Sequence, residues 1–272
     1  LSKYSCIITI ERKLINKIIK IFFYYYGIMD INKSDESVEI TPGNIIFIKD
    51  ELLEKVDESL VTGETDRKIP KILHLTYYSK EVVPSYVFDN IIKYCGDYKI
   101  IFYDDDACIN ELKQIDSKLA DKFISFEKGP HKADLFRYCI LYKYGGVYLD
   151  IKSDLQMPLN NFIDHTLNNT LYTVRTKKRN RCHQGCIATY PQNDIFNLLI
   201  ENMLIQSDKP AYHFTCEKMY QLIMSDIACS GMTIGFNKGN KDTNYILFLE
   251  KNLRYDGEKV ADKYGGYWKI LT

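Results

Sequence analysis

The sequence lacks any run of about 20 apolar residues, the length that a membrane-spanning helix requires. The nearest approach, residues 18–29, is interrupted by Lys20 and diluted by three tyrosines. Such a segment fits a helix that covers apolar surface, an interfacial helix, or the remainder of a longer anchor. The sequence begins with Leu1 and not with Met, so we expect its natural start to lie further upstream.

The sequence also lacks an excess of charge of either sign, because 36 Lys and Arg residues balance 36 Asp and Glu residues. A neutral chain offers no long-range field for a polyanion, so we expect no nucleic-acid partner. Residues 175–181 are a local exception, with five basic residues in seven positions. This run fits a solvated loop, or a contact with a diphosphate, an acidic acceptor or the head groups of a membrane surface.

Familiar site signatures are also lacking. The sequence shows no Ser-His-Asp order, no P-loop and no G-x-G-x-x-G fingerprint. Its eight cysteines include no C-x-x-C pair, and we expect free, buried thiols in a reducing compartment. Cys182, His183 and Cys186 leave zinc as an alternative, but a structural zinc site needs four ligands and no fourth is apparent.

What is present is an alternation of strand-like and helix-like segments after residue 62. Strands are predicted at residues 69–76, 98–103, 147–151, 171–174, 186–189 and 233–236, and helices at 84–95, 132–144 and 194–205. Asp106 is expected to cap a further helix that follows the strand at 98–103. This order predicts an α/β fold with a mostly parallel central sheet over residues 63–272. Residues 1–62 are predicted to form a separate, helical N-terminal extension, with helices at 10–29 and 50–61, to which we assign no role.

The predicted helix at 132–144 carries charge in an apolar setting. Asp134 and Arg137 are three residues apart and share a helical face, while apolar residues nearly encircle the helix. A charged pair on so buried an element needs partners, so a ligand-binding role and an ordinary ion pair both remain open. The double glycine at 145–146 predicts the helix end.

Asp150 follows the next predicted strand, at the edge where α/β sheets bind ligands. An extended chain would place Tyr148, Asp150, Lys152 and Asp154 on one side. A carboxylate there is suited to ribose hydroxyls or to a divalent cation on a diphosphate, although Asp150 alone is also compatible with a plain turn.

Two motifs together resemble a known family. Residues 69–77, IPKILHLTY, are similar to the opening strand of glycosyltransferases with a DXD sugar-binding region. Residues 132–150, KADLFRYCILYKYGGVYLD, resemble the signature of that family, which includes Golgi α-1,6-mannosyltransferases and sphingolipid mannosyltransferases and shares its core with large glucosylating toxins. The resemblance covers roughly residues 68–160, and more faintly the C-terminal Tyr267-Trp268.

This resemblance implies a GT-A type, Rossmann-like nucleotide-sugar-binding fold and retention of configuration at the anomeric carbon. It implies that Tyr77 stacks on the donor base and that Asp134 and Arg137 contact sugar and ribose hydroxyls. Asp150 would be the first Asp of the motif, and Trp268 a further substrate-binding residue.

The chain departs from the family pattern at two positions. Lys152 stands where the motif has its second Asp, and Lys263 stands where the family often has His. We therefore expect Lys152, together with Lys263, to neutralise the donor diphosphate in part instead of a Mn²⁺ or Mg²⁺ ion. Asp154 could alternatively restore a metal site with Asp150.

The sequence thus predicts a hexosyltransferase, best matched to mannose, that uses a GDP- or UDP-sugar and a glycan, glycolipid or protein acceptor. Two alternatives remain open: a catalytically impaired protein that binds nucleotide sugars, and a toxin-like protein glycosyltransferase. The localisation stays unassigned between the cytoplasm and a membrane surface.

Overall fold

The computed structural model describes residues 45–47, 67–155, 157–176, 180–227, 232–249, 253–260 and 265–270, with the backbone alone for the last two segments. The chain divides into two compact units, residues 1–36 and 37–272, and all described residues belong to the second. The helices predicted at 10–29 and 50–61 lie outside the described residues. β1 (Ile45–Phe47) falls within the predicted extension, yet it is a strand of the main sheet.

The main sheet orders its described strands as β1-β3-β2-β4-β7-β6-β9-β8. Their bounds are β2 (Ile72–Thr76), β3 (Lys99–Tyr103), β4 (Gly146–Leu149), β6 (Thr170–Arg175), β7 (Cys182–Thr189), β8 (Gly235–Lys238) and β9 (Asn244–Leu249). β1, β3, β2 and β4 pair in parallel, as do β6 and β9, whereas β7 and β8 run against their neighbours. The predicted fold class, α/β with a mostly parallel sheet, is confirmed, and the arrangement is consistent with a GT-A-like domain.

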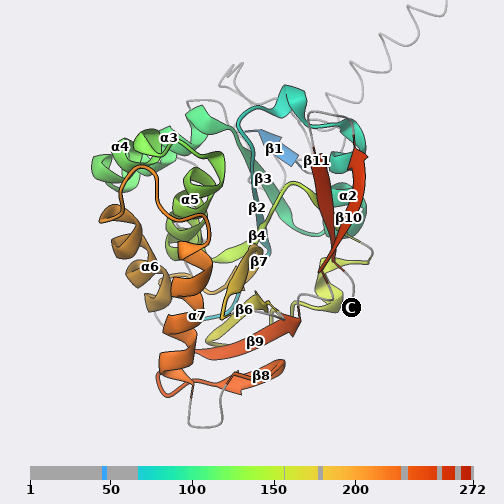
Figure 1. Ribbon diagram of the computed structural model, residues 1–272. Helices are drawn as coiled ribbons and strands as arrows, with labels where there is room; N and C mark the ends of the chain where they lie inside the picture. The colour runs from blue at the N-terminus through green and yellow to red at the C-terminus, as the bar shows by residue number, and fades with distance from the viewer. Residues whose placement is uncertain are drawn as a thin grey trace, which may run out of the picture. The chain divides into compact units, whose positions relative to one another are not determined.

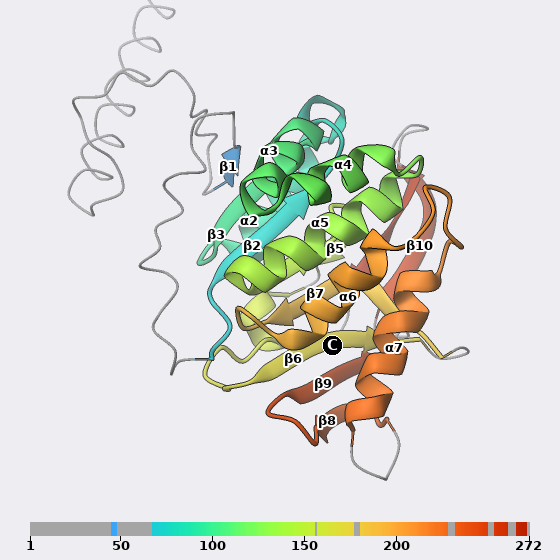
Figure 2. The same cartoon turned by 90° about the vertical axis from the view of Figure 1, so that its left-hand side faces the viewer.

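Helices cover both faces of this sheet (Figures 1 and 2). One face carries α3 (Asp105–Ile115), α4 (Ser117–Ser125), α5 (Gly129–Tyr144), α6 (Asp194–Leu204) and α7 (Phe214–Asp226). The other face carries α2 (Ser85–Cys95), the short 3-10 turns η3 (Lys80–Val82) and η4 (Leu159–Asn161), and a second, small sheet. Each face buries its own apolar cluster, so the sheet is covered on both sides, as parallel sheets require.

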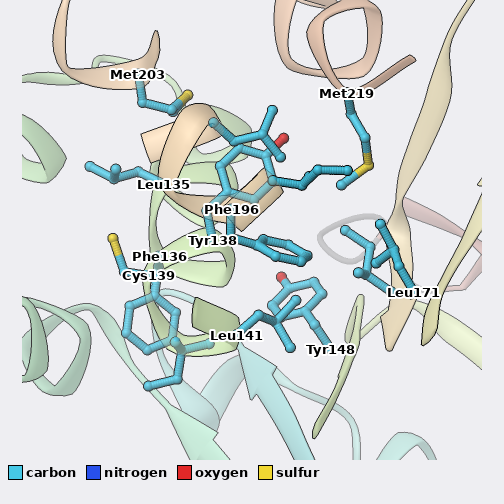
Figure 3. Packing of buried hydrophobic residues seen from close by; sticks show 14 of the residues in the cluster. Leu135, Phe136, Tyr138, Cys139, Leu141, Tyr148, Leu171, Phe196, Met203 and Met219 are labelled. Carbon is cyan, nitrogen blue, oxygen red and sulfur yellow. The ribbon is translucent and has the colours of Figure 1, made fainter. Parts of the chain in front are cut away.

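Helix α5 is buried on almost every side, as its sequence predicts. Tyr138 packs against the ring of Phe196 on α6, with 6.0 Å between ring centroids, and near Tyr148 of β4 (Figure 3). Burying one such large apolar side chain contributes about 1.5–3 kcal/mol to stability. The helix is therefore a central element of the core, and the charged residues on it are held in a fixed place.

Two glycines end α5 and start β4. Gly145 and Gly146 have φ angles of 63° and 92°, a region that other residues rarely adopt. A Cβ on Gly146 would lie 2.6 Å from the Ile72 carbonyl oxygen on the neighbouring strand. The glycines therefore let the chain reverse sharply against the sheet, which sends β4 back beneath the helix that precedes it.

The cap of α3 differs from the prediction. Asp104 caps the helix, because its carboxylate accepts a 2.8 Å hydrogen bond from the backbone N–H of Ala107. The prediction that Asp106 is the cap was wrong: β3 ends at Tyr103, so the first residue outside the strand takes this position, and Asp106 lies in the first helical turn.

A small sheet in the order β10-β11-β5 lies on the α2 side and is formed by β5 (Ser153–Leu155), β10 (Leu253–Val260) and β11 (Gly265–Ile270). Asn90 of α2 ties β5 in place, because its amide donates to the Asp154 carboxylate and to the Leu155 carbonyl at 2.8 and 2.9 Å. Within the described residues, no helix combines the length and apolar character needed to cross a membrane.

Candidate functional site

Asp150 lies at the carboxyl end of β4, where the chain turns. The Ser153 N–H donates to the Asp150 carbonyl at 2.8 Å, and β5 starts immediately afterwards in the other sheet. The expectation that Tyr148, Asp150, Lys152 and Asp154 share one strand face was therefore wrong, because the chain does not stay extended. A shared strand face no longer supports a metal site of Asp150 with Asp154, whose carboxylate accepts from Asn90.

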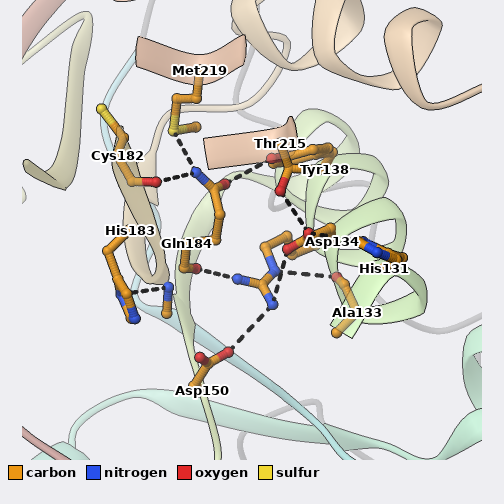
Figure 4. A network of polar contacts seen from close by, with 12 residues as sticks. His131, Ala133, Asp134, Tyr138, Asp150, Cys182, His183, Gln184, Thr215 and Met219 are labelled. Atoms are coloured by element: carbon orange, nitrogen blue, oxygen red, sulfur yellow. Dashed lines mark hydrogen bonds and ion pairs between the residues drawn. The ribbon is translucent and has the colours of Figure 1, made fainter. Parts of the chain in front are cut away.

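Arg137 brings Asp134 and Asp150 into one network (Figure 4). Its guanidinium lies 3.4 Å from the Asp134 carboxylate and 3.3 Å from that of Asp150. The side chains of Arg137 and Asp134 are only 5% and 9% exposed, whereas that of Asp150 is 31% exposed. The charged side chains thus form a continuous series from the protein interior to the carboxylate of Asp150, which solvent or a ligand can reach.

The guanidinium of Arg137 is fixed by further contacts. It donates to the carbonyl oxygens of Ala133 and Gln184, and it stacks over the Tyr148 ring at 4.3 Å from the centroid. Burial opposes its charge, but Tyr148, Asp150 and Asp134 together raise its pKa. Arg137 is therefore a permanent buried cation held in one orientation.

Asp134 is the innermost acid of this network. Burial is the main reason that its pKa is raised, to about 6, while Arg137 and a 2.7 Å hydrogen bond from the Thr215 hydroxyl act in the opposite direction. Thr215 lies on α7, so this helix and α5 hold the carboxylate between them. The group consequently titrates near neutral pH, and not in the usual acidic range.

Strand β7 supplies the rest of the surroundings of Asp150. The Asp150 N–H donates to the Gly185 carbonyl at 2.8 Å. The register between β6 and β7 shifts between Tyr172 and Val174, which marks a bulge in β7 before Ala188. Bulges commonly re-aim side chains next to functional sites, and here the bulge presents His183, Gln184 and Gly185 to the network. Gln184 accepts from Tyr138 at 2.7 Å.

Lys152 lies in the turn that follows Asp150 and is half-buried. Burial lowers the pKa of its ammonium group, and the negative charge of Asp150 opposes that shift. Lys152 thus belongs electrostatically to the same site, at the position of the second Asp of the motif.

Three other predicted site residues, Tyr77, Trp268 and Lys263, come from other segments of the chain. Tyr77 follows β2, the parallel neighbour of β4, and its ring lies 4.8 Å from that of Tyr78. Trp268 pairs with Ser153 across the small sheet, so its backbone lies beside the turn after Asp150. Lys263 lies outside the described residues, and the roles of all three stay predictions.

The described residues do not fit a complete divalent-cation site. They contain no group of three or more His, Cys, Asp or Glu side chains that could hold a metal. Asp150 already faces the guanidinium of Arg137, and Lys152 adds a second cation beside it. No metal-dependent step is therefore derived from this arrangement.

The cysteines of the described segments are free thiols. Cys95, Cys108, Cys139, Cys182 and Cys186 are buried, and Cys216 is half-buried, whereas Cys6 and Cys229 lie outside the described residues. Burial raises the pKa values of Cys182 and Cys186 to about 12, so both thiols are protonated at neutral pH. They also belong to different core clusters.

The first and last residues of the basic run at 175–181 form hydrogen bonds to other segments of the chain. Arg175 donates to the Met232 carbonyl at 2.7 Å, and Arg181 donates to Glu217 at 2.9 Å. Residues 177–179 lie outside the described residues. Two of the five basic side chains thus serve contacts to neighbouring segments.

Sequence reasoning missed Thr215 and the role of β7. Thr215 is 81 residues from Asp134, and nothing in its local pattern indicates the contact. In the sequence, His183 stands out only through its spacing to Cys182 and Cys186. The one usable signal was the resemblance of residues 132–150, which carried Asp134, Arg137 and Asp150 but not their partners.

Comparison with known proteins places this region in context. Residues 82–168 match the profile of a family described as "Glycosyltransferase sugar-binding region containing DXD motif". The match includes α5, β4 and the turn with Asp150 and Lys152.

Several curated proteins are similar over parts of the chain. An uncharacterised glycosyltransferase of Acanthamoeba polyphaga mimivirus is 27% identical over 145 residues, 52% of this chain and 57% of that protein. A mannosyl phosphorylinositol ceramide synthase of Saccharomyces cerevisiae is 33% identical over 94 residues, 34% of this chain and 25% of that protein. Inositol phosphoceramide mannosyltransferase 3 of Schizosaccharomyces pombe is 30% identical over 142 residues, 50% of this chain and 38% of that protein.

These matches confirm the predicted resemblance to glycosyltransferases with a DXD-type sugar-binding region. The chain spans between 25% and 57% of the length of these three relatives.

Proposed function

Starting from this sugar-binding region, we propose that the protein is a retaining glycosyltransferase that moves a hexose from a nucleotide diphosphate sugar to a hydroxyl group of a glycan or lipid. The observation that carries the proposal is the continuous network from Asp134 through Arg137 to the exposed carboxylate of Asp150. It lies at the carboxyl end of β4, the side of an α/β sheet where ligands bind.

Each of the three residues would have its own role in binding the donor. Asp150, the accessible member, accepts hydrogen bonds from hydroxyl groups of the donor sugar or ribose. Arg137 fixes the Asp150 carboxylate, and Asp134 fixes Arg137 from behind. No residue of the site stands out as a covalent nucleophile, so the proposal assigns catalysis to positioning and to stabilisation of charge in a tight donor–acceptor complex.

The departing nucleotide diphosphate needs positive charge nearby. We assign this to Lys152, which is half-buried beside Asp150, with Lys263 as a second cation. The ammonium group replaces part of the charge that a divalent cation supplies in other DXD-type domains, and the described residues offer no complete ligand set for such an ion.

Mannose and a lipid acceptor are the preferred substrates under this proposal. They rest on relatives whose names are mannosyl phosphorylinositol ceramide synthase and inositol phosphoceramide mannosyltransferase. Since these relatives are matched over only part of their length, substrate identity needs direct measurement.

The decisive experiment is a transfer assay with GDP-mannose, UDP-glucose and UDP-galactose, each offered with inositol phosphoceramide, a free mannoside or a cell-extract protein fraction. We expect transfer from GDP-mannose to the lipid, with retained configuration of the product. Asp150→Asn should lower the rate about 100-fold or more, as for loss of a central electrostatic group. Asp154→Asn is the matched control, since it removes one carboxylate charge from the next strand, and it should cost less than about fivefold if Asp154 acts only through Asn90.

A second candidate, a nucleotide-sugar-binding protein with impaired catalysis, is favoured by Lys152 at the motif position. Slow hydrolysis of GDP-mannose or a UDP-sugar without acceptor would argue against it, provided that Asp150→Asn abolishes the hydrolysis. Binding of a nucleotide sugar without transfer or hydrolysis under any condition would support it. Transfer to protein alone would favour the toxin-like alternative.

A further inference from the structure

His183 stands beside Asp150 on the neighbouring antiparallel strand. β4 and β7 pair through Leu149 and Cys186, and the pairing continues with the hydrogen bond from Asp150 to Gly185. His183 precedes Gly185 by two residues and is half-buried. Figure 4 shows His183 and Asp150 in the same region, at the edge of the network.

Gly185 brings the imidazole and the carboxylate together. A Cβ atom at this position would lie 2.5 Å from Cε1 of His183 and 2.6 Å from Oδ2 of Asp150. Heavy atoms do not approach this closely, so any other residue would displace one of the two side chains. Because Gly185 has no side chain, the imidazole of His183 and the carboxylate of Asp150 can both lie against its Cα atom.

The hydrogen bond at Nδ1 decides which nitrogen of His183 carries the proton. The backbone N–H of Gly185 donates to Nδ1 at 3.1 Å, so Nδ1 acts as an acceptor. In a neutral imidazole the other nitrogen then carries the hydrogen. The Nε2–H group is consequently a donor, and neither nitrogen offers a lone pair to a metal ion.

The charges around His183 indicate which ligand suits this donor. Arg137 faces Oδ1 of Asp150, and Oδ2 lies on the Gly185 side with the imidazole. Lys152 follows two residues later and interacts electrostatically with Asp150. An N–H donor next to an ammonium group fits an anion with several oxygens better than it fits a cation.

We infer that His183 is a further donor-site residue, whose Nε2–H group donates a hydrogen bond to an oxygen of the nucleotide diphosphate. The inference rests on the proposed function and adds to it a binding residue from β7. It also explains why a half-buried histidine precedes the bulge next to Asp150.

The first test measures binding of GDP, UDP and guanosine by calorimetry in excess EDTA. His183→Ala should weaken the binding of the preferred nucleoside diphosphate about tenfold or more, the usual loss for a hydrogen bond to a charged group, and should leave guanosine binding within about twofold. His183→Gln, which keeps an N–H donor, should recover part of the loss. His165→Ala is the control, because His165 contacts Ile69 and Tyr98 at the amino end of β2, away from the site.

Two outcomes separate this inference from the proposed function. If the wild-type protein binds neither GDP nor UDP, the proposed function fails and the inference fails with it. If the wild type binds one of them and His183→Ala binds it equally well, only the inference is overturned. Circular dichroism establishes that each variant is folded before binding is compared.

A second test needs no loss of function. Long-range ¹H–¹⁵N spectra of the imidazole groups report their tautomers, and His183→Gln assigns the signal of His183. We expect the Nε2–H tautomer, with a shift of this signal on addition of the preferred diphosphate but not of guanosine. Either of two results would overturn the inference: an Nδ1–H tautomer, which leaves no hydrogen on Nε2 to donate, or Mn²⁺ binding that His183→Ala abolishes, which would make the imidazole a metal ligand.

Discussion

Helix α5 carries two buried charged clusters that differ in one respect. Near its start, Asp134 and Arg137 join Asp150 and Thr215. In its last turn, Lys143 and Tyr144 both donate to one oxygen of Glu111 on α3, at 2.8 and 3.0 Å. Both clusters place a charge in the core, where it needs partners.

The two clusters reach solvent through groups of opposite charge. Asp150 is 31% exposed, whereas Glu111 is fully buried and its second carboxylate oxygen has no hydrogen-bond partner among the described residues. The Glu111 cluster joins two helices, and the group through which it reaches solvent is the ammonium group of Lys143, whose side chain is 34% exposed. A buried ion pair on a helix is therefore not a site by itself; the route to an accessible carboxylate at the end of a strand is what distinguishes Asp134 and Arg137.

The largest expected effect comes from breaking the first cluster at its centre. Arg137→Met leaves Asp134 buried without its cation, so the free energy of unfolding should fall by about 3–5 kcal/mol and transfer should be lost. Urea unfolding and the transfer assay measure the two effects. Adding Asp134→Asn should restore at least half of the stability but no activity; recovery of both would make the cluster purely structural.

Breaking the second cluster should affect stability alone. Glu111→Gln removes the charge that pairs with Lys143, and we expect a loss of about 1–3 kcal/mol in the free energy of unfolding. The rate of transfer at a temperature where the variant is folded should stay within about twofold. A loss of rate as large as that of Asp150→Asn would erase the contrast between the two clusters.

Acid should switch the first cluster. Burial raises the pKa of Asp134 to about 6 from 3.8, so the folded protein binds this proton more tightly than the unfolded chain does. Lowering the pH through 6 therefore favours the fold through Asp134 but removes the charge that orients Arg137. Donor binding should weaken by up to about tenfold between pH 7 and 5. Asp134→Asn should remove this inflection, and a binding curve of unchanged shape in this variant would be inconsistent with the assignment.

The smallest effect is expected from chelation. If Lys152 supplies the positive charge at the diphosphate, excess EDTA should change the transfer rate by less than about twofold, because an ammonium group is not removed by a chelator. Lys152→Ala should then be slow and should gain rate when Mn²⁺ is added. Complete loss of wild-type activity in EDTA, with recovery in Mn²⁺, would show that the lysine hypothesis is wrong.

The order of elements was largely predictable from local patterns. The strand at 69–76, the helix at 84–95 and the glycine-terminated helix at 132–144 all have counterparts in β2, α2 and α5. They were visible because apolar periodicity and turn glycines act over a few residues. The ends of the elements were less predictable, since β4 stops at Leu149 and the chain then turns.

Several described elements were not predicted, among them α4, α7 and β9. In α7, Thr215 and Asp226 occupy buried positions, so its buried face does not read as a simple apolar stripe. Strand β9 pairs with β6, more than 70 residues earlier in the chain, and this pairing leaves no local signal. Such elements depend on partners that sequence spacing does not reveal.

The sequence by itself determined the alternation of strands and helices, the glycine-ended helix α5 and the three charged residues near its turn, because each depends on neighbours along the chain. Only the tertiary structure decided which of these charges meet. Arg137 reaches Asp150 because β4 returns beneath α5, and Thr215 and His183 arrive from α7 and from a bulge in β7. Packing, and not local pattern, sets those distances. The placement of Lys152 and His183 at one site therefore follows only from the fold.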